Sequence, residues 1–96
     1  MITYEALVRY ARTLEGKTLE TSARHKRFKV EVVKDELAYT PESRKQRINN
    51  KSTVEKVLKQ FNETKSYKPS DYEMTRNASY LMRVLELMTS TGKTSR

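Results

Sequence analysis

The stretch RFKVEVVKDELAYTP, residues 27–41, decides the fold. In its first half apolar residues alternate with charged ones, and the apolar positions include Phe28, Val30 and Val32. A two-residue period of this kind is that of a strand with one buried face. The second half, LAYTP, predicts a returning strand that ends at Pro41 or lies at a sheet edge there, because proline cannot donate to a strand ladder.

Between these two strands the sequence KDE predicts a turn. A two-residue loop at Lys34-Asp35 would place Val30 opposite Tyr39. The next pair on the same face would then be Val32 and Leu37. Both pairs are apolar, so this register is self-consistent and predicts an antiparallel hairpin. Lys-Asp is not a favoured pair for so tight a turn, and a longer loop is the alternative.

Helix and strand patterns continue on both sides of the hairpin. The expected elements are a helix over residues 4–15, a short strand within 17–23, a polar connection over 42–51, a helix over 52–64 and a helix within 70–90. The two later helices open with capping-box spacings, at Ser52 and at Ser70. Thr75 and Asn77 are alternative starts of the last helix.

This order of elements predicts an α+β fold: a helix, a three-stranded antiparallel meander, then two helices packed on one face of the sheet. We expect a single small domain over residues 1–89, because 96 residues suit one core. Residues 90–96 have nothing to bury and are expected to form a flexible tail. The sequence carries no motif by which we recognise a family.

The charge of the chain suggests its partner. It has 20 Lys and Arg against 12 Asp and Glu, a formal net charge of +8. A polyanion is the natural partner of such a surface, and nucleic acid is the first expectation because each phosphate contacted releases counterions. We expect DNA ahead of RNA. Residues 1–16 are interrupted by charges, so no signal peptide or membrane span is predicted there and a cytoplasmic protein is expected, with no membrane partner.

Two basic clusters should converge at one end of the sheet. In a meander, the loop before the second strand and the loop after the third lie at the same end. The candidate nucleic-acid-binding residues in these loops are Arg24, His25, Lys26, Arg27, Arg44, Lys45, Gln46, Arg47 and, further on, Lys51. Arginine binds phosphate bidentately, the amide of Gln46 can read adenine, and Lys51 lies near a helix N-terminus, which holds anions. The loops therefore predict a phosphate clamp.

Other interpretations stay open beside the clamp. Basic loops are often only solvated. A protein-interaction module, dimeric through the C-terminal helix, is the main alternative, because Met82 and Leu87 lie off the apolar stripe of that helix. Less favoured is a small metal-independent ribonuclease toxin with His25 as general base and arginine stabilising the transition state.

The sequence predicts neither catalytic residues nor a cofactor or metal. It has one His, no Cys and two Gly, so a thiolate or multi-histidine metal site and a Gly-rich phosphate loop are not expected. Four tyrosines are candidates for stacking on bases: Tyr39, Tyr67, Tyr72 and Tyr80. Of these, Tyr39 is expected in the core, Tyr80 between helices, and Tyr67 to be the most exposed.

Overall fold

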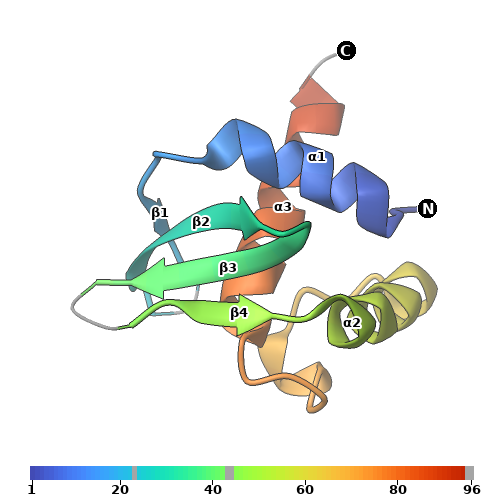
Figure 1. The fold of residues 1–96 in the computed structure, drawn as a ribbon. Coiled ribbons are helices and arrows are strands. Elements are labelled where there is room, and N and C mark those ends of the chain that lie inside the picture. Colours follow the sequence, from blue (N-terminus) through green and yellow to red (C-terminus); the bar gives the residue numbers. More distant parts are fainter. Residues whose placement is uncertain (23, 43–44, 95–96) are drawn as a thin grey trace.

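The computed structural model confirms an α+β fold in which helices and an antiparallel sheet share one core (Figure 1). It describes residues 1–22, 24–42 and 45–94, with the last four by their backbone alone. In chain order the elements are α1 (Tyr4–Leu14), β1 (Leu19–Glu20), β2 (Arg27–Val33), β3 (Glu36–Pro41), β4 (Arg47–Asn49), α2 (Lys51–Thr64), the 3₁₀ helix η1 (Pro69–Asp71) and α3 (Ala78–Thr94). Among the described residues, no helix has the length and apolar character needed to cross a membrane.

The predicted hairpin of β2 and β3 is confirmed in its register. Val30 pairs with Tyr39, and Val32 pairs with Leu37. Lys34-Asp35 forms the two-residue turn, with φ angles of 51° and 63°. Positive φ at both central positions is the conformation that suits the twist of a hairpin, and here it is adopted without glycine. The longer loop that we considered is therefore not used.

The expected polar connection after β3 contains a fourth strand. β4 pairs antiparallel with β3, and the strand order in the sheet is β1-β2-β3-β4. The one apolar residue of β4, Ile48, points to the outer face and is 47% exposed. Asn49 is buried instead, and its Oδ1 accepts a hydrogen bond of 3.1 Å from the Tyr39 hydroxyl. Because the inward residues of β4 are polar, its sequence lacks the alternation of apolar and polar residues that predicts a strand. The sheet therefore has four strands and not the three that we expected.

Helices α2 and α3 do not begin at the predicted capping boxes. The N-cap of α2 is Asn50, whose Oδ1 accepts from the backbone N of Thr53 at 2.9 Å, so the helix starts one residue before Ser52. The predicted start at Ser70 falls in η1, a separate turn. α3 begins after Asn77, which agrees with the later of the alternative starts.

The core lies between the inner face of the sheet and the helices α1, α2 and α3. Its largest buried side chains include Leu7 of α1, Val54 of α2, Leu81 of α3, and Phe28 and Tyr39 of the sheet. Met82 of α3 is only 2% exposed, and Leu87 is partly buried against the core. The expectation that Met82 is an exposed apolar position was wrong, and the core of the same chain covers both side chains at least in part.

Candidate nucleic-acid interface

The loop before β2 and the connection after β3 lie at the same end of the sheet, as the meander predicts. Phe28, near the start of β2, pairs with Pro41 at the end of β3. One residue further, the backbone N of Glu42 donates to the carbonyl of Arg27 at 3.1 Å. The ladder therefore brings the two predicted basic segments to one end.

The β1–β2 loop is held by its own hydrogen bonds. Thr21 is 4% exposed, and its Oγ1 accepts from the backbone N of Lys26 at 3.1 Å. The backbone of Thr21 bonds in turn to Lys26 O and His25 N, each at 2.9 Å. On the other side of the loop, the Ser22 hydroxyl bonds to Glu86 of α3. The described residues on the two sides of residue 23 are therefore joined to each other and, through Ser22, to α3.

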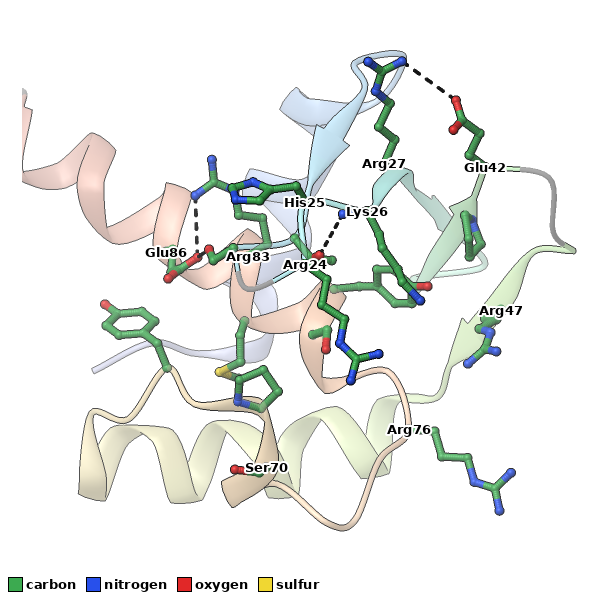
Figure 2. A pocket seen from close by; sticks show the side chains of 18 residues that line it. Arg24, His25, Lys26, Arg27, Glu42, Arg47, Ser70, Arg76, Arg83 and Glu86 are labelled. Atoms are coloured by element: carbon green, nitrogen blue, oxygen red, sulfur yellow. Dashed lines mark hydrogen bonds and ion pairs between the residues drawn. The ribbon is translucent and has the colours of Figure 1, made fainter.

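A hollow of about 1020 Å³ opens beside this loop (Figure 2). The hollow is lined by residues of this loop, of the ends of β3 and β4, of η1 and of the first half of α3. Its basic lining residues are Arg24, His25, Lys26, Arg27, Arg47, Arg76 and Arg83, and its acidic ones are Glu42 and Glu86. We call this feature the basic hollow.

Two arginines of the basic hollow already have acidic partners. Arg27 lies 3.8 Å from a carboxylate oxygen of Glu20 and 4.0 Å from one of Glu42. Figure 2 shows it pointing toward Glu42. Arg83 lies 3.6 Å from Glu86 on the next turn of α3. Their charges are partly compensated within the protein.

Four other cations of the basic hollow are not compensated in this way. The side chains of Arg24, Lys26, Arg47 and Arg76 make no ion pair or hydrogen bond with any residue that the structure describes. In Figure 2, Arg24 and Lys26 descend from the loop, and Arg47 approaches from β4. The four cations therefore come from three separate segments that line one hollow, and in Figure 2 the side chain of Arg76 extends away from Arg24.

Lys51 does not belong to this group. Its backbone N donates to Glu36 Oε2 at 2.9 Å, and its ammonium lies 5.3 Å from the centre of the Tyr4 ring. Glu36 borders the hairpin turn, at the opposite end of the sheet. Our placement of the α2 N-terminus beside the basic loops was wrong, because β4 carries the chain across the sheet first. A carboxylate also occupies that helix N-terminus already.

The second predicted loop contributes less than expected. Arg44 lies outside the described residues. Lys45 is exposed but does not line the basic hollow, and the Gln46 amide bonds to Glu31 on the outer face of the sheet. Of the predicted binding residues in this loop that the structure describes, Arg47 alone lines the basic hollow.

Sequence reasoning missed Arg76 and Arg83. Nothing in the local pattern around these residues indicates that they lie beside a loop some fifty residues earlier. Their position follows from the packing of α3 against the sheet, and a pattern within one segment carries no signal of such packing.

An aromatic ring forms part of the same wall. Tyr80 lines the basic hollow and is half-buried. Its ring centre lies 5.5 Å from that of Tyr39, in a stacked arrangement, and 4.8 Å from that of Phe28. Tyr67 also lines the hollow, but it is only partly exposed, and its hydroxyl bonds to Thr89 at 2.7 Å. The expectation that Tyr39 lies in the core is confirmed.

His25 is the candidate general base in the ribonuclease interpretation. Its side chain is 75% exposed, and its Nδ1 lies 3.6 Å from Glu20. In the described part of the chain, no cluster of three or more His, Cys, Asp or Glu could hold a metal ion.

Comparison with protein-family models, with curated proteins and with solved structures finds no match to this chain.

Proposed function

We propose that the protein binds nucleic acid through the basic hollow. The observation that carries the proposal is the convergence of four cations, Arg24, Lys26, Arg47 and Arg76, that have no acidic partner among the described residues. Gathering like charges costs free energy unless an anion compensates them. A chain of phosphates supplies several anionic groups at the spacing of a backbone, so it can meet several of these cations at once.

The hydrogen bonds among the described residues of the β1–β2 loop support the same function. Thr21 and Ser22 hold this loop against its own ends and against α3. The backbone of Lys26 takes part in these bonds and is therefore held in place before a ligand binds. A preorganised loop lowers the entropic cost of association.

A salt titration tests the proposal. The logarithm of the affinity should fall linearly with the logarithm of salt concentration, with a slope of about −3 to −4 if the four cations each meet a phosphate. The double variant Arg24→Gln/Arg47→Gln removes two contacts and should make the slope shallower by about 1.4–1.8. Fluorescence anisotropy of a labelled oligonucleotide measures both values.

The matched control removes the same charge elsewhere. Arg9 and Lys34 are exposed and do not line the basic hollow. The double variant Arg9→Gln/Lys34→Gln should leave the slope close to that of the unchanged protein. Absence of binding at low salt, or an equal change in slope for both double variants, would sink the proposal.

A ribonuclease activity is a second candidate, because His25 lines the basic hollow beside Arg24 and Lys26. An exposed imidazole next to phosphate-binding cations can act as a general base on a ribose hydroxyl. Incubation with RNA in the presence of a chelator tests this. Cleavage that His25→Ala abolishes without weakening RNA binding would assign the activity, and intact RNA would remove it.

A further inference from the structure

We infer that the basic hollow takes single-stranded nucleic acid, with one base packed against the ring of Tyr80. This inference rests on the proposed function and names the kind of nucleic acid that the same site binds. It follows from the shape of the site, from the position of one aromatic ring and from the mixed chemistry of the wall.

The shape of the site favours a flexible strand. The cations line a hollow between the β1–β2 loop, β4 and the segment before α3. Proteins read duplexes with a helix or ribbon that enters a groove. Bending a stiff duplex into a hollow between three segments costs free energy, whereas a flexible single strand can follow the walls at a lower cost.

Tyr80 offers a surface for a base. It is half-buried, and Tyr39 and Phe28 support its ring from the core side, at 5.5 Å and 4.8 Å between ring centres. Tyr39 is fully buried, so the ring of Tyr80 has a rigid backing. Bases stack readily on aromatic side chains in sites for single strands, and such a contact is worth roughly 5- to 150-fold in affinity.

The rest of the wall has the two chemistries that a nucleotide needs. Partly exposed Pro69 and Tyr80 lie in the lining together with the uncompensated cations, and buried Pro41 and Met82 lie behind them. A base has a flat apolar face, and its phosphate is anionic. A polyanion without bases, such as a sulfated polysaccharide, would leave the apolar part of this wall without a contact. In a duplex the base faces are stacked on one another and are not available to Tyr80.

The test compares three ligands on the unchanged protein at one salt concentration. They are a mixed-sequence DNA strand without self-complementarity, its duplex with the complementary strand, and an abasic strand of the same length. The single strand should bind at least about fivefold more tightly than the other two, because only it offers a free base. Equal affinity for the abasic strand would overturn the base contact, and equal affinity for the duplex would overturn the preference for single strands.

A pair of variants examines the ring itself. Tyr80→Leu should weaken single-strand binding by roughly 5- to 150-fold and leave duplex binding unchanged, whereas Tyr80→Phe should retain binding because it keeps the ring. Circular dichroism and urea unfolding establish that each variant is folded. If Tyr80→Leu does not fold, the comparison with the abasic strand decides the question alone. If no ligand binds at low salt, the proposed function itself fails, which is a different outcome from equal binding of strand and duplex.

Discussion

Removing the hydroxyl of Tyr39 should destabilise the fold by about 1–3 kcal/mol. The hydroxyl donates at 3.1 Å to Oδ1 of Asn49, and the two residues are 0% and 2% exposed. In Tyr39→Phe the ring still packs on Phe28 and Tyr80, so the buried apolar area is kept. What is lost is the hydrogen bond, and an acceptor is left in the interior without a donor.

This bond also matters for the basic hollow. It joins the inner face of β4 to β3, where Tyr39 is paired with Arg47 in the ladder. A slip of one residue in this register would turn Arg47 to the outer face of the sheet. The buried polar pair is thus the interaction that aligns a short edge strand whose sequence has no inward apolar residue.

A double-mutant cycle measures the pair. Urea unfolding of Tyr39→Phe, Asn49→Leu and the double variant gives three changes in the free energy of unfolding. Each single change should cost about 1–3 kcal/mol, and the double change should cost less than their sum by about 1–3 kcal/mol, because no polar group is then left unpaired. Tyr67→Phe is the matched control: its hydroxyl bond to Thr89 is part-buried, so water can replace it and the cost should stay below about 1 kcal/mol. Single changes that add to within about 0.5 kcal/mol would refute the reasoning.

Two further predictions concern the turn and the alkaline limit of stability. Lys34 has a φ of 51°, a conformation that asparagine adopts more readily than lysine does. The variant Lys34→Asn should therefore stabilise the protein by roughly 0.5–1 kcal/mol and raise its Tm by about 2–8 °C. An unchanged Tm would contradict this prediction. Burial raises the pKa of Tyr39, and burial followed by nearby Glu36 raises that of Tyr4, each from an ordinary value of 10.0. The tyrosines of the unfolded chain lose their protons at a lower pH than folded Tyr4 and Tyr39 do. The free energy of unfolding that these two residues contribute is therefore fully present below about pH 10 and falls above it. Tyrosinate absorbance from all six tyrosines before unfolding would refute the reasoning.

The hairpin was predictable from sequence because its information is local. The alternation of Val30 and Val32 with charged residues specifies both the strand and its buried face, and the partners Leu37 and Tyr39 then allow one register. The same meander predicts that Arg24–Arg27 and the segment before Arg47 meet at one end. Lys51 was misplaced because β4 has polar inward residues, and an unseen strand moves everything after it to the other end of the sheet.

The sequence by itself determined the α+β class, the register of β2 and β3, the excess of positive charge and the loops that carry much of it. The tertiary structure alone decided which of those charges face one space. α3 lies more than fifty residues after the β1–β2 loop, yet Tyr80 packs on Phe28, and Glu86 bonds to Ser22 across 64 residues. Side-chain periodicity encodes which face of an element is buried, whereas the partner of that face is chosen by packing of the whole core. Arg76, Arg83 and Tyr80 therefore join the basic hollow only in the folded chain.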